Sequence, residues 1–166
     1  MTAARAGDRD AFASLLDGEV GIAYRLARVV VRSDASAQDA VQEACIRAWR
    51  DLGRLREPDR WEPWFRRIVI RAAIDEARRD GRARRAMPAQ LDPVVPDESD
   101  ALARRDAIAR ALEFVSPDER ALLALRFVSD LDLPDVARAL GIPLGTAKSR
   151  LHRALAKLRA KMKDET

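Results

Sequence analysis

The chain has 166 residues, of which 48% are hydrophobic, 35% are charged and only 5% are aromatic. These proportions fit one domain or two small ones and favour helical bundles, because strand and hairpin signals are weak. A single cysteine, Cys45, excludes an internal disulfide and a cysteine-based zinc site. No apolar run could span a bilayer and the N-terminus lacks the layout of a signal peptide, so we expect a cytoplasmic protein.

The net charge of +4 is modest, but the charges are unevenly distributed. Residues 145–163 contain seven Lys or Arg and no acid, and residues 66–85 contain eight Arg against three acids. Residues 91–100 contain four acids and no base. Two basic segments joined by an acidic strip favour binding to a polyanion at two places, although solvated helix faces are an alternative explanation.

The first half of the chain shows helical spacing of its apolar residues. The spacing predicts a helix over residues 10–32 with a break at Asp17-Gly18, and a second helix over residues 37–52 that Ser36 can cap. On the second helix the apolar stripe is predicted to consist of Val41, Cys45, Ala48 and Trp49. The opposite, polar side of this helix carries Asp39, Gln42, Glu43, Arg47 and Arg50.

A third helix is predicted from Trp61 to Arg79, with Pro63 in its first turn. We expect Trp64, Ile68, Ala72 and Ile74 to point inward. Aromatic side chains beside arginines can hold unpaired bases, but they can equally form a core with arginines at its rim. After Asp80 the periodicity ends, and one glycine and three prolines (Gly81, Pro88, Pro93 and Pro96) together with the acids predict a flexible linker.

The second half contains clear helix starts. A helix is expected over residues 100–115, and Ser116-Pro117-Asp118-Glu119 has the form of a capping box with proline at the first helical position. Asp132 is predicted to cap a short helix that ends at Gly141, a residue free to adopt the left-handed conformation of a tight helix end. A longer helix follows, with Pro143 in its first turn.

This last helix has two contrasting faces. Its apolar face comprises Leu144, Ala147, Leu151, Leu155 and Leu158, and its opposite face comprises Thr146, Ser149, Arg150, Arg153 and Lys157, flanked by Lys148 and His152. A helix with this pattern, behind a short helix and a tight turn, is typical of a helix-turn-helix reader of the DNA major groove. The only histidine, His152, is expected to fill space or contact a phosphate.

Four segments together resemble bacterial RNA polymerase sigma factors of the sigma-70 family, in the extracytoplasmic-function (ECF) subgroup. The segments are Asp39 to Arg50, Trp64 to Arg79, Ser116 to Phe127, and Leu140 to Ala154. They resemble, in that order, region 2.2, the regions that open and read the −10 promoter element, region 4.1, and region 4.2, which reads the −35 element. The order and separations make the resemblance specific over nearly the whole chain.

The resemblance implies an all-α protein of two small helical domains joined by a flexible linker, the second ending in a helix-turn-helix. We expect residues 1–80 to form the region 2-like domain, 81–100 the linker and 101–166 the region 4-like domain. The implied function is binding core RNA polymerase, through its β and β′ subunits, and directing it to promoter DNA without catalysis. An anti-sigma factor is a further expected partner, and neither cofactor nor metal is expected.

The resemblance also assigns site residues. Core polymerase would contact Asp39, Gln42, Glu43 and Arg47. The −10 element would contact Trp61, Trp64, Arg67, Arg71 and Arg78. The −35 element would contact Thr146, Lys148, Ser149, Arg150, Arg153 and Lys157, among which arginine is the best reader of guanine.

The chain departs from the family pattern at two positions. Many members carry Arg-Asn where this chain has Ile70-Arg71, so the family's −10 preference does not carry over directly. Ala147 replaces a commoner valine, which changes packing and leaves the groove-facing residues untouched. The alternative function is a helix-turn-helix regulator that is not a polymerase subunit, for which the face from Asp39 to Trp49 would be unnecessary.

Overall fold

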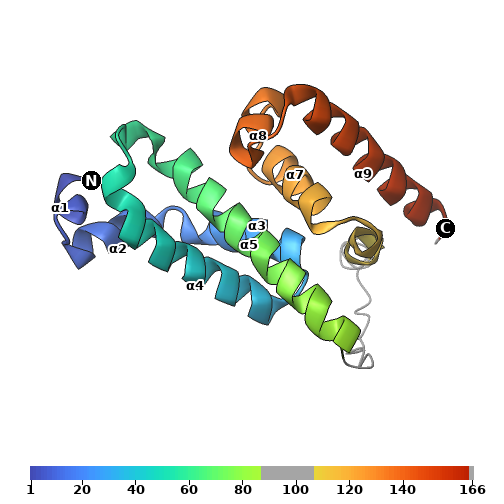
Figure 1. Ribbon diagram of the computed structural model, residues 1–166, viewed down its shortest axis with the longest axis horizontal. Helices are drawn as coiled ribbons and strands as arrows, with labels where there is room; N and C mark the ends of the chain where they lie inside the picture. The colour runs from blue at the N-terminus through green and yellow to red at the C-terminus, as the bar shows by residue number, and fades with distance from the viewer. Residues whose placement is uncertain (87–106, 165–166) are drawn as a thin grey trace.

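The computed structural model describes residues 1–86 and 107–164, and every regular element in those residues is a helix (Figure 1), as the all-α prediction requires. The N-terminal lobe (residues 1–86) consists of α1 (Thr2–Arg5), α2 (Arg9–Asp17), α3 (Val20–Val31), α4 (Asp34–Asp51), η1 (Leu52–Arg54), η2 (Pro58–Arg60) and α5 (Trp61–Ala86). The C-terminal lobe (residues 107–164) consists of helical residues 107–111, η3 (Leu112–Phe114), α7 (Pro117–Phe127), α8 (Leu133–Leu140) and α9 (Leu144–Asp164).

The helix ends follow most of the predicted signals. The break between α2 and α3 lies at the predicted Asp17-Gly18. The capping box at α7 is confirmed, because Ser116 Oγ accepts from the Glu119 backbone N–H at 3.3 Å and Glu119 Oε2 accepts from the Ser116 backbone N–H at 3.0 Å. Asp132 caps α8 as predicted.

Two boundaries in the N-terminal lobe differ from the predictions. Helix α4 begins three residues early, because Ser33 and not Ser36 is its cap; the Ser36 hydroxyl instead donates to Asp80 Oδ2 at 2.9 Å. Helix α5 continues seven residues past its predicted end at Arg79, to Ala86. The remainder of the expected linker, 87–100, lies outside the described residues.

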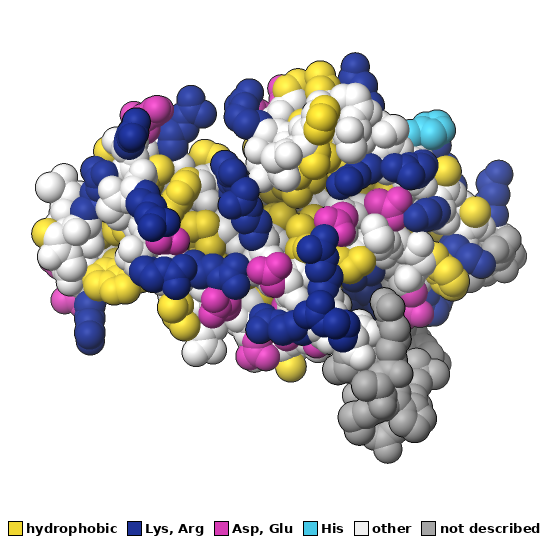
Figure 2. Space-filling view, in the orientation of Figure 1, with side chains coloured by type: hydrophobic (Ala, Val, Ile, Leu, Met, Phe, Trp, Pro, Cys, Tyr) yellow, Lys and Arg dark blue, Asp and Glu magenta, His cyan; other side chains and the backbone are white. Residues whose placement is uncertain are grey.

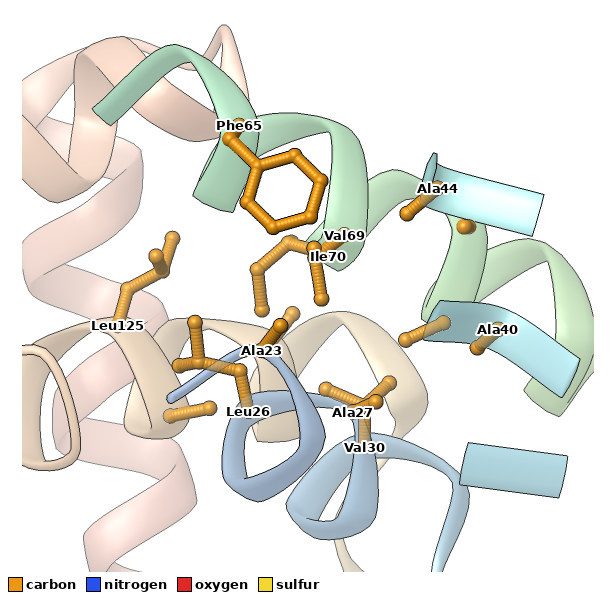
Figure 3. Close-up of a cluster of buried hydrophobic side chains, with 14 of the residues drawn as sticks. Ala23, Leu26, Ala27, Val30, Ala40, Ala44, Phe65, Val69, Ile70 and Leu125 are labelled. Carbon is orange, nitrogen blue, oxygen red and sulfur yellow. The ribbon is translucent and has the colours of Figure 1, made fainter. Parts of the chain in front are cut away.

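Helices α3, α4 and α5 pack against one another to form the core of the N-terminal lobe. The buried face of α4 is made almost wholly of small residues, Ala37, Ala40, Ala44 and Ala48, none more than 1% exposed. With no long side chain between the backbones, α4 can lie close to its neighbours and present its other faces to solvent. Figure 3 shows Ala40 and Ala44 facing the cluster formed by α3 and α5.

The inward face of α5 is rotated relative to the prediction. Its buried residues are Trp61, Phe65, Val69, Ile70, Ala72, Ala73 and Ala77, whereas Trp64, Ile68 and Ile74 are half-buried. The buried arc is wide because α5 contacts α3 and α4 of its own lobe and also α7 and α8 of the other lobe. Of the predicted inward residues, Ala72 is fully buried, and Trp64, Ile68 and Ile74 pack against the buried cluster from its edge.

Helices α7, α8 and α9 form the C-terminal lobe, in which α8 and α9 make the predicted helix-turn-helix. The turn depends on Gly141, whose φ of +67° lies in the left-handed region that side chains with a Cβ disfavour. On α9, Ala147 is buried and Leu151, Leu155 and Leu158 are half-buried, as expected, but Leu144 is 39% exposed.

The two lobes share one hydrophobic core. Leu122 and Leu125 of α7 and Val136 of α8 belong to the same buried cluster as Leu26 of α3 and Ile70 of α5, and each is at most 1% exposed. In Figure 3, Leu125 points toward Leu26, beside Phe65 and Ile70. Helix α7 therefore lies against α3 and α5 on one side, with α9 at the outer edge of the molecule (Figure 1).

Candidate nucleic-acid and protein interfaces

The predicted reading face of α9 is largely open to solvent. Lys148, Ser149 and Arg153 are exposed, and Thr146 and Arg150 are half-buried. The Ser149 hydroxyl donates to the Thr146 carbonyl at 3.0 Å, and Arg153 Nε donates to the Ser149 carbonyl at 3.4 Å. Among the described side chains, no carboxylate pairs with Lys148, Arg150 or Arg153, so their charges are available to a polyanion.

Lys157 differs from the other predicted residues of α9, because it faces its own lobe. Its Nζ donates to both carboxylate oxygens of Glu119 at 3.0 and 2.8 Å, which ties α9 to the start of α7. Burial opposes ionisation of Glu119, but the Lys157 ammonium and the backbone and hydroxyl of Ser116 together lower its pKa. Lys157 thus supports the reader helix, and a phosphate would have to compete with Glu119.

Two of the predicted −10 contacts lie at the start of α5, and the structure separates them. Trp61 is only 6% exposed; its Nε1 donates to the Leu15 carbonyl at 3.0 Å and its ring stacks on Phe65 at a centroid distance of 5.1 Å. Trp64 is half-buried and keeps part of its ring accessible. Trp61 therefore belongs to the core in this arrangement, and Trp64 is the aromatic side chain that a base could reach.

Three arginines extend the predicted −10 face along α5, and they differ in their surroundings. Arg71 is exposed, whereas Arg67 is half-buried with its Nε lacking a hydrogen-bond partner in the described residues. Burial, followed by the nearby charge of Arg71, lowers the pKa of Arg67. Arg78 is engaged by the other lobe, because its Nη2 donates to both Asp118 oxygens at 3.1 Å.

Arg66, in the same helix, has a structural role. Its Nε and Nη2 donate to the two carboxylate oxygens of Glu19 at 2.8 and 2.9 Å, and Glu19 is only 5% exposed. Hydrogen bonds to Glu19 raise the pKa of Arg66 against the opposing effect of burial. This bidentate pair holds the first turns of α5 on α3 and takes no part in an exposed face.

On α4, the predicted polymerase-binding residues divide between two faces. Asp39 and Gln42 are exposed, whereas Glu43 and Arg47 are half-buried and paired at 2.7 Å. Arg47 Nη1 also donates to Asp75 of α5 at 3.2 Å. The acid and amide of the first face are free to meet a partner, while Glu43 and Arg47 brace α4 against α5.

The exposed face of α4 also contains apolar residues that the sequence analysis did not assign to it. Ile46 is 53% exposed, and Trp49, which was predicted to point inward, is 36% exposed with its ring edge against Phe12 at 5.0 Å between centroids. With Arg9 and Cys45 these three residues line a shallow apolar hollow, and burial raises the pKa of the Cys45 thiol. The spacing 39, 42, 46, 49 is a helical stripe and is the signal that could have revealed this face.

Basic side chains are prominent on the face shown in Figure 2, both over α5 and along the outer helix α9, with acidic side chains between them. Within residues 1–86 and 107–164, none of the helices has both the length and the hydrophobicity needed to span a bilayer.

Comparison with known families agrees with this arrangement of helices. Residues 15–83 match the model of sigma-70 region 2, and residues 105–158 match that of sigma-70 region 4. The ECF sigma factor SigM of Mycobacterium tuberculosis is 36% identical over 155 residues, which cover 92% of this chain and 78% of SigM. This chain belongs to the ECF sigma factors of the sigma-70 family.

Other relatives of this sigma factor cover nearly its whole length. SigL of M. tuberculosis is 30% identical, and the match covers 99% of this chain and 96% of SigL. SigW of Bacillus subtilis is 27% identical, and the match covers 95% of this chain and 92% of SigW. The same fold occurs in the sigma factor RpoE of Bartonella quintana in complex with the anti-sigma factor NepR, with a TM-score of 0.74 and 23% identity; the match covers 92% of this chain and 96% of that chain. It also occurs in CnrH in complex with the cytosolic domain of CnrY, with a TM-score of 0.72 and 24% identity; this match covers 99% of this chain and 96% of that chain.

The protein is therefore a sigma factor that directs transcription initiation, a non-catalytic subunit that binds core RNA polymerase and promoter DNA. The match to region 2 disfavours the alternative of a free-standing helix-turn-helix regulator, which would have no need of a polymerase-binding domain.

Proposed function

We propose that this sigma factor binds the polymerase through α4, the −10 element through α5 and the −35 element through α9. The region 2 unit comprises residues 1–80 and the region 4 unit comprises residues 101–166. The segment between them, 81–100, begins with the last six residues of α5. The protein acts in the cytoplasm, where polymerase and promoters are found.

On the polymerase side, the exposed stripe of α4 docks on the β′ subunit, and the region 4 unit contacts the β subunit. The stripe supports this role because an apolar centre, Ile46 and Trp49, adjoins Asp39 and Gln42. An apolar centre with a polar rim is the usual anatomy of a protein interface. The acid orients the encounter with a basic partner and the apolar pair provides buried area. Glu43 and Arg47 position the helix from its other side.

On the promoter side, Trp64, Arg67 and Arg71 of α5 hold unstacked bases and the strand backbone of the −10 element. Unstacking a base costs a few kcal/mol, which stacking on an aromatic ring and ionic contacts can offset. Arg71 stands where many family members have asparagine, so a charged side chain replaces an amide in the base pocket. Arg78 joins this face once Asp118 releases it.

At the −35 element, α9 enters the major groove with Arg150 and Arg153 as base readers and Lys148, Ser149 and Thr146 as phosphate contacts. The observation that carries the proposal is the row of cations on α9 that have no carboxylate partner among the described residues. An unpaired cation on an exposed helix face costs little in water and is available for a strong contact with guanine or phosphate.

A matched pair of substitutions tests this role. Arg150→Ala is expected to reduce run-off transcription from a −35-dependent promoter by about tenfold or more, because one good arginine–guanine contact contributes about 1–3 kcal/mol. Arg159→Ala removes the same charge nine residues later, on the opposite side of α9, and should leave transcription nearly unchanged. Loss of co-purification with core polymerase in Arg150→Ala would contradict the assignment, as would equal effects of the two substitutions.

We also propose that an anti-sigma factor regulates this protein, since two sigma factors of the same fold are found in complexes with such partners. A pull-down with the tagged sigma factor from its own cells, followed by mass spectrometry, would identify it. Recovery of core polymerase alone would count against this partner.

A further inference from the structure

A single carboxylate connects the start of α7 to the second half of α9. Glu119 Oε2 accepts from the Ser116 backbone N–H at 3.0 Å and so closes the capping box of α7. The same oxygen accepts from Lys157 Nζ at 2.8 Å, and Glu119 Oε1 accepts from Lys157 Nζ at 3.0 Å. Glu119 therefore has two roles, because it completes the end of one helix and binds a side chain of another.

The two partners of this ion pair differ in their exposure. The side chain of Glu119 is 9% exposed, whereas that of Lys157 is 44% exposed. Burial opposes ionisation of Glu119, but hydrogen bonds from Lys157 and Ser116 hold its pKa below the ordinary value. The carboxylate is thus charged and largely enclosed, and removal of the ammonium that compensates it would leave a buried charge with a poorer partner.

An apolar cluster holds the neighbouring side of α9 against α7 (Figure 1). Ala154 of α9 is buried with Leu112, Val115 and Leu123 of the same lobe. Apolar contacts are non-directional, so this cluster keeps α9 at a fixed distance from α7 but determines the rotation of α9 about its own axis only weakly. Lys157, three residues after Ala154, adds a directional contact beside the cluster.

The rotation of α9 about its axis decides whether its reading face meets the bases. Lys157 lies seven residues after Arg150, which is close to two helical turns, so the two side chains leave the helix in nearly the same direction. The ends of the side chains lie about 5–6 Å from the helix axis, so a rotation of about 20° would move them by about 2 Å. Such a shift breaks a hydrogen bond to a base, because hydrogen-bond lengths vary by only about 0.5 Å.

We propose that Glu119 and Lys157 are positioning residues for −35 recognition, which fix the rotation of α9 so that Arg150 and Arg153 meet their bases. This inference rests on the proposed role of α9 at the −35 element. Lys157 does not bind a DNA phosphate, because its ammonium stays on Glu119. Without this ion pair α9 rotates and loses its base contacts, while the other cations of the helix still attract the DNA backbone.

Uncharged variants at the two positions test the proposal, in the full chain bound to core polymerase. Lys157→Met removes the ammonium and keeps most of the apolar stem. Glu119→Gln removes the negative charge, and its amide oxygen can still close the capping box of α7, since glutamine is accepted at that position. Lys163→Met is the matched control, because it removes the same charge from an exposed lysine near the end of the same helix.

Fluorescence anisotropy compares the affinity of each holoenzyme for a promoter duplex that it transcribes and for the same duplex with a scrambled −35 sequence. We expect Lys157→Met and Glu119→Gln each to weaken binding to the intact promoter by about three- to tenfold, within the range for residues of one ion-pair network. Binding to the scrambled duplex should change by less than about twofold, and the double variant should lose no more affinity than either single variant. Lys163→Met should leave both affinities nearly unchanged.

The salt dependence of binding separates positioning from a phosphate contact. Removal of a lysine that binds a phosphate weakens binding to both duplexes and lowers the slope of log affinity against log salt concentration by about 1. That result for Lys157→Met would overturn the proposal, and so would additive losses in the double variant. Equal losses on both duplexes with an unchanged slope would also overturn it, because they would show that the ion pair only stabilises the fold.

Arg150→Ala, measured with the same duplexes, separates this inference from the proposed function. If Arg150→Ala binds both duplexes as tightly as the unmodified chain does, the proposed −35 role of α9 is wrong. If Arg150→Ala selectively loses affinity for the intact promoter while Lys157→Met and Glu119→Gln do not, the −35 role stands and the positioning inference is wrong.

Discussion

Arginine residues of similar sequence context have different roles in this sigma factor, and the nearest carboxylate decides which. Arg66 is bound by the buried Glu19 and is structural, whereas Arg71, five residues later, is exposed. Arg78 lies between these cases because its partner, Asp118, belongs to the other lobe. The sequence could identify the basic stretch, but it could not separate these roles, since the partners lie 40 or more residues away.

Trp61 and Trp64 allow a prediction at the scale of single residues. Trp61→Ala removes a buried ring and a hydrogen bond to Leu15 and should lower the free energy of unfolding by about 3–5 kcal/mol. Trp64→Ala should cost less stability but strongly reduce promoter opening, because it removes the accessible ring. Urea denaturation would measure the loss of stability, and permanganate footprinting of the −10 region would measure promoter opening. A larger loss of promoter opening in Trp61→Ala than in Trp64→Ala, with little loss of stability, would show that Trp61 leaves the core to bind DNA.

At the scale of helices, local signals predicted more than periodicity did. The capping box at Ser116, the Asp132 cap and the Gly141 helix end were all predicted, because each depends on residues within one turn. The rotation of α5 was missed, since its wide buried arc results from contacts with both lobes. In α7, by contrast, the sequence did indicate that the helix is enclosed, because residues 121–125 are five consecutive apolar residues, and all five are buried. A helix that is apolar all round is expected to be enclosed on several sides.

Helix α4 gives a prediction about a whole face. Ile46→Asp places a charge at the centre of the exposed stripe, and the centres of protein interfaces tolerate charge poorly. We expect it to weaken binding of core polymerase by tenfold or more, a loss of about 1–3 kcal/mol of binding free energy. Stability should change little, since Ile46 is 53% exposed. Gln38→Asp on the same helix introduces the same charge away from the apolar pair and serves as the control. Equal affinities of the two variants for core polymerase, measured by fluorescence anisotropy, would show that Ile46 and Trp49 are not the centre of the polymerase interface.

At the scale of the molecule, the two units predicted from the sequence are present, but they are not independent bodies in this structure. The sequence predicts a region 2 unit and a region 4 unit on either side of a linker. Residues from both units form a single buried cluster. The match between α7 and the α3–α5 surface could not be inferred from one sequence, because it depends on shape complementarity between elements about 90 residues apart.

The shared core predicts coupled unfolding. All three tryptophans, Trp49, Trp61 and Trp64, lie in the N-terminal lobe, so their fluorescence reports on that lobe alone. Leu125→Ala, in the other lobe, should nevertheless move the tryptophan transition to lower urea, with a loss of about 2–5 kcal/mol for a buried leucine. Circular dichroism should show the same midpoint. An unchanged tryptophan transition, preceded by a separate loss of helicity, would show that the lobes unfold independently.

The contact of α7 with α3 and α5 also affects how copies of the chain behave together. The surface that α7 covers on its own α3 and α5 is identical in every copy, so two chains can exchange their C-terminal lobes and make a swapped dimer with the same contacts. Within one chain the two lobes are covalently joined, so each lobe meets the other at an effective concentration on the order of millimolar. Exchange therefore becomes competitive only in very concentrated samples, and at micromolar concentrations each chain pairs with itself.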